Sequence, residues 1–192
     1  MNILLFSASL RQHSYNQLLV DYLAKYLGTE CVTDTLLPGQ FALPLFNQDL
    51  ESNTEIITQV AQIYTRFRNA DGFIVASPEY NGHVSPYLKN TLDWVSRMQR
   101  INGQKFPANP FLNKPLLLAS ASTGWTGGLL GLQDARSVFG YLGCLVMQGQ
   151  VCVSDAGSVF SGGSVNFDPA YATYVKNMVE QFQSLVSRNK QA

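Results

Sequence analysis

The chain has 192 residues, of which 46% are hydrophobic and 14% are charged, so it has the size and composition of a folded domain with a sizeable core. Lysine plus arginine and aspartate plus glutamate each number 13, and a formal charge of zero with scattered basic residues argues against nucleic-acid binding. The apolar run at 3–6 is too short for a signal peptide, and no stretch reaches membrane-spanning length. The sparse cysteines disfavour disulfides, and the sparse histidines disfavour a metal site. We therefore expect a cytoplasmic protein without a membrane partner.

Strand and helix patterns alternate along the chain. Residues 2–7 are an apolar run, whereas residues 30–36 are polar enough for an edge strand. Ser52, with Glu55 three residues later, predicts a capping box for a helix that runs to about Asn69. The expected strands are 2–7, 30–36, 71–77, 115–120 and 144–153. The expected helices are 16–27, 52–69, 86–97, 128–142 and 169–188, with Gly28 and Gly143 as stops and Asp168 as the last N-cap.

Five strand–helix units in this order predict a doubly wound α/β fold. The first, third and fourth strands are continuous apolar runs, which indicates strands covered by helices on both faces. Five strands favour a parallel sheet in the order 2-1-3-4-5 over a six-stranded dinucleotide-binding fold. We expect one domain over residues 1–192. The connection 98–114 is long, and disorder, a lid and a subunit contact are all compatible with it.

The loop after the first strand carries donors suited to an anion. Ser9 and Ser14 supply hydroxyls, Asn16 an amide and Arg11 a guanidinium, and the following helix start adds free backbone N–H groups. A phosphate socket is one interpretation; an ordinary N-cap at Ser14 with a solvated Arg11 is the other. The loop lacks the Walker and GxGxxG patterns, which disfavours a nucleoside triphosphate or a Rossmann dinucleotide.

Two further loops leave neighbouring strands of the predicted sheet. In residues 77–85, Asn81 and Gly82 permit a sharp turn whose N–H groups can address the edge of a flat ring, with Tyr80 beside it; a plain turn is the alternative. In residues 120–128, small residues permit close approach of a ligand, and Trp125 is either a stacking wall or a surface aromatic. Together the loops suit a mononucleotide with a large flat ring.

Two strings in these loops resemble motifs of the NADPH-dependent FMN reductase family. ASLRQHSYN resembles GSLRxxSxN, with Ala8 in the place of glycine, and PEYNGHVSPYLKNTLDW resembles PEYNGSxPGxLKNxxDW, with His83 in the place of serine. The third loop resembles the family's Gly-rich segment, and the match follows the loop order over nearly the whole chain. The resemblance implies a flavodoxin-like three-layer sandwich.

The same resemblance implies a function and a set of binding residues. The expected activity is an FMN-dependent NAD(P)H oxidoreductase, with NADPH or NADH as co-substrate, that passes electrons to a quinone, azo, metal-oxyanion or flavin acceptor. The flavin carries the chemistry, so no catalytic side chain is expected. The expected FMN-binding residues are Ser9, Arg11, Ser14, Tyr15, Asn16, Pro78, Glu79, Tyr80, Asn81, Gly82, Ser122, Gly124 and Trp125.

Other functions remain alternatives at this stage. A flavodoxin-like electron carrier is disfavoured by the zero net charge and by Arg11, and a phosphatase is disfavoured because residues 7–16 contain no cysteine. An FMN-binding regulatory protein stays open.

We also expect a homodimer or homotetramer. The predicted helix 86–97 carries more apolar residues than one sheet-facing stripe needs, and the segment 98–114, with Phe106 and Phe111, is placed to reach a second chain. The alternative is that these residues cover the subunit's own core.

Overall fold

The computed structural model describes residues 1–101 and 108–191, and one parallel sheet forms its centre. The sheet order is β2 (Val32–Leu36), β1 (Asn2–Ser7), β3 (Gly72–Ala76), β6 (Pro115–Ala121), and then two short strands, β7 (Leu145–Val146) and β8 (Val151–Val153), which both pair with β6. The predicted order 2-1-3-4-5 is confirmed. The expected strand 144–153 is divided, because residues 147–150 leave the ladder between β7 and β8.

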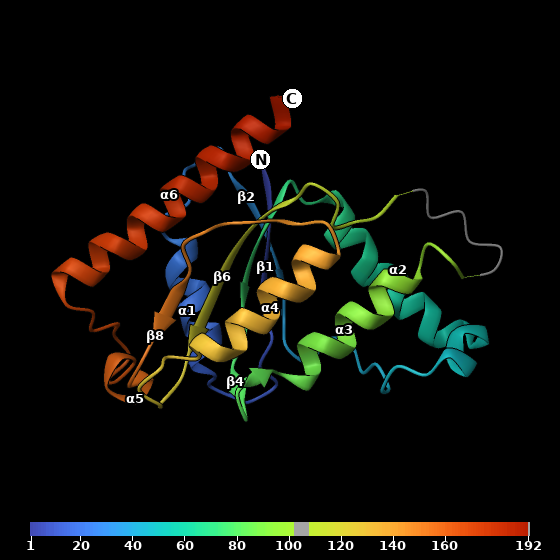
Figure 1. Ribbon diagram of the computed structural model, residues 1–192, viewed down its shortest axis with the longest axis horizontal. Coiled ribbons are helices and arrows are strands. Elements are labelled where there is room, and N and C mark those ends of the chain that lie inside the picture. The colour runs from blue at the N-terminus through green and yellow to red at the C-terminus, as the bar shows by residue number, and fades with distance from the viewer. Residues whose placement is uncertain (102–107, 192) are drawn as a thin grey trace.

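Helices cover both faces of this sheet (Figure 1). One face packs against α1 (Tyr15–Ala24) and α6 (Pro169–Gln191), and the other against α2 (Thr54–Asn69), α3 (Pro86–Arg97) and α4 (Leu129–Tyr141). Successive residues of a strand point to opposite faces, so Ile3 and Leu5 join the α1–α6 core while Leu4 and Phe6 join the other. Two buried faces explain the uninterrupted apolar runs of the central strands.

Three short elements complete the fold. A 3₁₀ helix, η1 (Gln48–Ser52), precedes α2, a small antiparallel hairpin of β4 (Glu79–Tyr80) and β5 (His83–Val84) follows β3, and α5 (Ala156–Val159) follows β8. Among the described residues, no helix is long and apolar enough to cross a membrane.

Two helix boundaries differ from expectation. The capping box at Ser52 is wrong, because Asn53 caps α2 by accepting hydrogen bonds from the N–H groups of Glu55 and Ile56, while the Ser52 hydroxyl bonds back to Asp49 within η1. Helix α1 ends at Ala24 rather than at 27, before Gly28. By contrast, Asp168 caps α6 as predicted, through the N–H groups of Ala170 and Tyr171.

The apolar residues of α3 serve this chain's own core. Trp94 and Val95 are completely buried, and so is Phe111 in the segment after the helix. The idea that α3 and Phe111 present an extra apolar surface to a second chain is therefore wrong. Phe106 lies outside the described residues.

Candidate functional site

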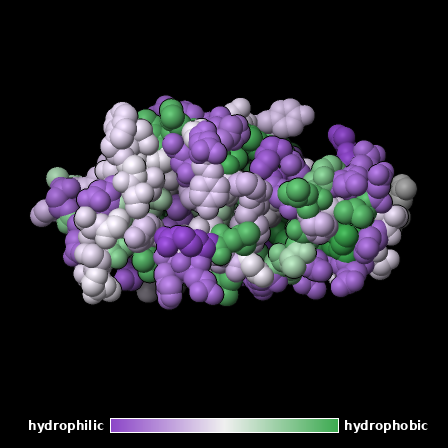
Figure 2. Space-filling model, turned by 90° about the horizontal axis from the view of Figure 1, so that it is seen from below, coloured by the Kyte–Doolittle hydropathy of each residue, from purple (hydrophilic) through white to green (hydrophobic). Residues whose placement is uncertain are grey.

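The three loops chosen from the sequence leave adjacent strands at one edge of the sheet. Ser7 at the end of β1 pairs with Ala76 of β3, which pairs with Ala119 of β6, so their carboxyl ends lie side by side. Figure 2 views the molecule from below, towards this edge, and shows hydrophobic patches separated by hydrophilic side chains. Carboxyl edges of doubly wound sheets are where such folds bind ligands.

The first loop offers several hydrogen-bond donors that the protein does not use. Within the described residues, the backbone N–H groups of residues 9–12 have no acceptor. Ser9 and Ser14 are buried beside them, and Ser14 caps α1 by accepting a hydrogen bond from the N–H of Asn16 at 3.2 Å. The helix start adds the positive end of its dipole. This donor set fits a phosphate group.

A cation–π contact positions the guanidinium of Arg11 in this loop. The Arg11 Cζ lies 4.8 Å from the centroid of the Tyr15 ring, and the other neighbour of that ring is Phe160, stacked at 6.0 Å between centroids. The arginine is exposed and makes no ion pair among the described residues, so its charge is available to an anion. Phe160 had no signal in the sequence, because it is brought here by the chain after β8.

Asn16 joins the first loop to the third. Its side-chain amide donates to the carbonyl of Ala121 at 3.0 Å, and its side-chain oxygen accepts from the N–H of Ala121 at 3.0 Å. The amide is buried, and both its nitrogen and its oxygen are paired with the backbone of Ala121. In this arrangement Asn16 holds the two loops together rather than presenting its side chain to solvent.

The second loop is the tight β4–β5 hairpin. Asn81 and Gly82 form its two-residue turn with φ values of 54° and 76°, the left-handed geometry for which Asn-Gly is preferred. Their backbone N–H groups have no acceptor within the described part of the chain. Pro78 is buried behind the turn, and Tyr80 is 47% exposed on it.

Contacts with α4 and with the first loop fix this hairpin. The Glu79 carboxylate accepts a hydrogen bond from the N–H of Gly131 at 3.0 Å. The Ser85 hydroxyl donates to the carbonyl of Ala8 at 2.6 Å and accepts from the N–H of Leu88 as the N-cap of α3. Neither pairing was predicted, although Ser85 before Pro86 is a recognisable helix start.

The third loop packs closely against the end of β6, the strand that it follows. Gly128 has a φ of 87°, and a Cβ there would come within 1.9 Å of the Ser120 hydroxyl, so this position requires glycine. The Ser122 hydroxyl accepts from the N–H of Gly124 at 3.1 Å, which leaves its proton available. Trp125 is 91% exposed and supports neither side of the open question, a stacking wall or a surface aromatic.

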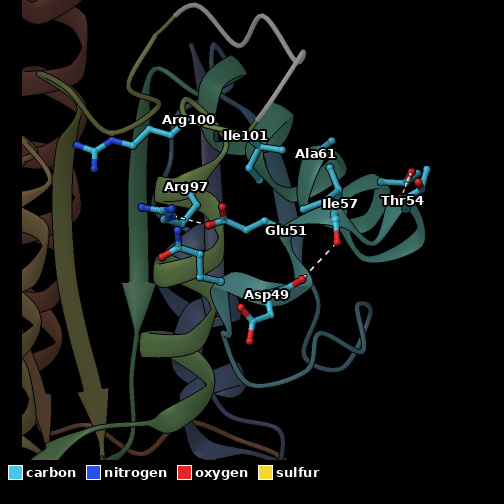
Figure 3. Close-up of a pocket in the computed structure, with 11 residues that line it drawn as sticks. Asp49, Glu51, Thr54, Ile57, Ala61, Arg97, Arg100 and Ile101 are labelled. Atoms are coloured by element: carbon cyan, nitrogen blue, oxygen red, sulfur yellow. Dashed lines mark hydrogen bonds and ion pairs between the residues drawn. The ribbon is translucent and has the colours of Figure 1, made fainter.

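A separate cavity lies away from the three loops. It measures about 740 Å³ between η1, α2 and the C-terminal end of α3 (Figure 3). Its lining mixes carboxylates with arginines, and the Nε of Arg97 lies 2.6 Å from an oxygen of Glu51. No residue of the three loops lines it, so the cavity is separate from the candidate site.

The described residues hold no side-chain cluster for metal or nucleophilic chemistry. No group of three or more His, Cys, Asp or Glu residues among them is placed to hold a metal ion. Burial raises the pKa of the Cys144 thiol to about 12 and raises the pKa of the Cys31 and Cys152 thiols, so all three favour the unreactive neutral form. The site is a set of binding groups.

Comparison with known proteins agrees with a flavin site. Residues 1–158 match the family model of NADPH-dependent FMN reductases. The chain is 29% identical over 147 residues to quinone reductase of Escherichia coli (strain K12), covering 77% of this chain and 73% of that protein. It is 30% identical over 148 residues to 2-hydroxy-1,4-benzoquinone reductase of Burkholderia sp, covering 77% and 74%. The flavoenzyme NAD(P)H:(acceptor) oxidoreductase of Paracoccus denitrificans shares the fold, with a TM-score of 0.81, 24% identity and 98% coverage of both chains.

Proposed function

The chain belongs to the NADPH-dependent FMN reductase family and is an NAD(P)H-dependent oxidoreductase with FMN as its cofactor; on this premise we propose that it passes electrons to quinones. The names of the two curated relatives support this acceptor class. The observation that carries the proposal is that two loops with unpaired backbone N–H groups, residues 9–12 and the Asn81–Gly82 turn, meet at one edge of the sheet in the described part of the chain.

The first loop would hold the FMN phosphate. Ser9, Ser14, the free N–H groups of residues 9–12 and the Arg11 guanidinium would surround the anion, with Tyr15 holding Arg11 in place. Asn16 would act through the contact that it makes with Ala121.

The second and third loops would hold the flavin ring. The N–H groups of Asn81 and Gly82, with Pro78 behind them and Tyr80 beside them, would line one part, and Ser122, Gly124 and Trp125 another. Glu79 belongs to this set as the residue that ties the hairpin to α4. Bound FMN would supply hydride acceptance from NADPH or NADH and electron transfer to the acceptor, and these residues would position and shield it.

An apolar rim at this edge favours a flat, uncharged acceptor. Tyr80 and Trp125 are exposed here, and so are Leu129 and Leu130 in the first turn of α4. Leu130 lies next to the hairpin, because a Cβ on Gly82 would be 3.8 Å from it. Quinones are flat and uncharged, so they match such a surface better than metal oxyanions do. Azo and flavin acceptors also differ from metal oxyanions in charge.

We further propose that residues 1–192 form one domain, that the protein works in the cytoplasm and that it is a homodimer or homotetramer. The assembly proposal rests on exposed apolar residues of α4, among which Tyr141 is 92% exposed. It does not rest on α3, whose apolar residues are internal.

The test is anaerobic reduction of the purified, FMN-loaded protein by NADH and by NADPH, followed by visible absorbance. We expect bleaching by at least one nicotinamide and recovery of the oxidised spectrum when a benzoquinone is added. Failure of both nicotinamides to bleach the flavin would favour an electron carrier. Failure to bind FMN would favour neither a reductase nor an electron carrier.

A further inference from the structure

One face of α4 lies against the β4–β5 hairpin. A Cβ on Gly131 would stand 3.0 Å from the carbonyl oxygen of His83 and 3.3 Å from the side chain of Glu79, so the backbone of the hairpin approaches the helix closely. Asp134 follows three residues later, nearly one turn along the same face. The hairpin therefore rests on the first two turns of α4.

His83 lies at the end of the hairpin turn and reaches Asp134 across this contact. Its Nε2 is 3.3 Å from an Asp134 carboxylate oxygen. Its Nδ1 accepts a hydrogen bond from the N–H of Val84 at 3.1 Å, so the neutral ring carries its proton on Nε2, the ring nitrogen that lies 3.3 Å from Asp134. Both ring nitrogen atoms therefore have a neighbour in the protein, although the side chain is 64% exposed.

This pair is placed to control the turn itself. His83 directly follows Asn81 and Gly82, whose N–H groups have no acceptor in the described chain. The Glu79 contact with Gly131 fixes the start of the hairpin, whereas the His83 contact with Asp134 fixes the strand that leaves the turn.

We propose that His83 and Asp134 are a positioning pair, which holds the N–H groups of Asn81 and Gly82 against the flavin ring and raises its reduction potential. The inference rests on the proposed function. N–H donors at the ring edge stabilise the electron-rich reduced form more than the oxidised form, so donors that are held in place favour reduction. The first loop would bind the phosphate, so this pair would not act on it.

The test compares two replacements of His83 and one of Asp134. His83→Gln keeps an amide donor within reach of Asp134, whereas His83→Asn is too short to reach it. Binding of FMN and of riboflavin to the apoprotein is measured by flavin fluorescence, and the midpoint potential is measured by equilibration with a reference dye. Neither measurement depends on turnover.

We expect His83→Asn and Asp134→Asn to weaken FMN and riboflavin binding by the same factor, about two- to fivefold for an exposed pair. Both should also lower the midpoint potential, and His83→Gln should restore most of each loss. The matched control is Glu180→Gln, which breaks an exposed carboxylate pair with Lys176 on α6. It should change nothing.

The possible outcomes separate this inference from the proposed function. FMN binding and potential that stay at wild-type values in His83→Asn and Asp134→Asn would overturn the positioning role while leaving the flavin site intact. A loss confined to FMN, with riboflavin unaffected, would also overturn it, because the effect would then lie at the phosphate. A wild-type protein that binds neither flavin would overturn the proposed function, and this inference with it.

Discussion

The carboxylate of Glu79 caps α4 from another loop, by accepting a hydrogen bond from the N–H of Gly131 at 3.0 Å. The N-cap position of that helix is Gly128, which has no side chain to do so. A charged oxygen near a helix start also interacts favourably with the helix dipole. Glu79 therefore ties the hairpin to the start of the helix that follows the Gly-rich loop.

Replacing Glu79 should destabilise the protein even without flavin. Glu79→Ala leaves the Gly131 N–H without its acceptor, and hydrogen bonds to charged groups contribute about 1.5–3 kcal/mol. Glu79→Gln keeps an acceptor and should lose less than half of that amount. Urea unfolding of the apoprotein measures both. Equal stability of Glu79→Ala and wild type would show that the capping contact contributes nothing in solution.

Arg11→Ala should weaken the binding of FMN but not that of riboflavin. The substitution would remove the charge-assisted contact that we propose between Arg11 and the phosphate, which corresponds to a loss of about 1.5–3 kcal/mol, or about ten- to a hundredfold in FMN affinity. Riboflavin has no phosphate, so its weaker binding should not change. Fluorescence titration of the apoprotein measures both flavins.

The controls for Arg11 test its place as well as its charge. Arg100→Ala removes an exposed arginine at the separate cavity and should leave both affinities unchanged. Tyr15→Leu removes the ring under the guanidinium and should weaken FMN about two- to fivefold, the range of an exposed cation–π contact. A protein in which Arg11→Ala weakens both flavins equally does not use this loop for phosphate.

Local patterns predicted the fold and the meeting of the three loops at one edge of the sheet. Apolar runs predicted the central strands, and the order of strands and helices placed three loops at one edge. The sequence could not show that Glu79 and Asn16 turn their side chains towards Gly131 and Ala121, because the partners are 52 and 105 residues away. Long-range pairing of this kind depends on packing.

The wrong prediction that α3 presents apolar residues to a second chain has a related cause. A helix packed between a sheet and a neighbouring helix has two buried sides, so a surplus of apolar residues does not indicate a subunit contact. Trp94 is held inside by the carbonyl of Pro44, to which its indole N–H donates at 2.8 Å, and Phe46 packs edge-on against its ring. The loop that covers this side precedes η1, and its position was not predictable from periodicity.

Asp71 should make the stability of the protein depend on acid pH. Burial raises the pKa of this carboxyl. The hydrogen bonds from Lys190 and from the Asn2 N–H, with the charges of Lys190 and Lys114, lower the pKa by more than burial raises it, so the net pKa lies below the usual value. A carboxyl whose pKa is lowered by folding stabilises the protein at pH values above its pKa in the unfolded chain, about 3.9. This stabilisation is lost as the pH falls through the pKa of the folded state.

The corresponding experiment follows thermal unfolding of wild type and Asp71→Asn from pH 7 to pH 3. Wild type should be the more stable protein at pH 7, and the difference should disappear at the acid end. In a Lys190→Gln background the difference should be smaller, because the 2.9 Å contact between Lys190 and Asp71 is already gone. A difference that is independent of pH would mean that the carboxylate charge is not the cause.

Assembly is tested at Tyr141, because the apolar residues of α3 are internal. Val95 is fully buried, so Val95→Glu would place an unpaired charge in the core and should prevent folding, whatever the oligomeric state. Tyr141 is 92% exposed at the end of α4, beside a groove of about 360 Å³ between α3 and α4. Tyr141→Glu should therefore leave the melting temperature of an isolated subunit unchanged while opposing contact with a second copy.

Light scattering at low micromolar concentration should give a dimer or tetramer for wild type and a smaller species for Tyr141→Glu. Gln133→Glu, an exposed position elsewhere on α4, is the matched control and should keep the wild-type size. A wild type that is already monomeric would refute the proposed assembly, and an oligomer unaffected by Tyr141→Glu would place the contact on another surface.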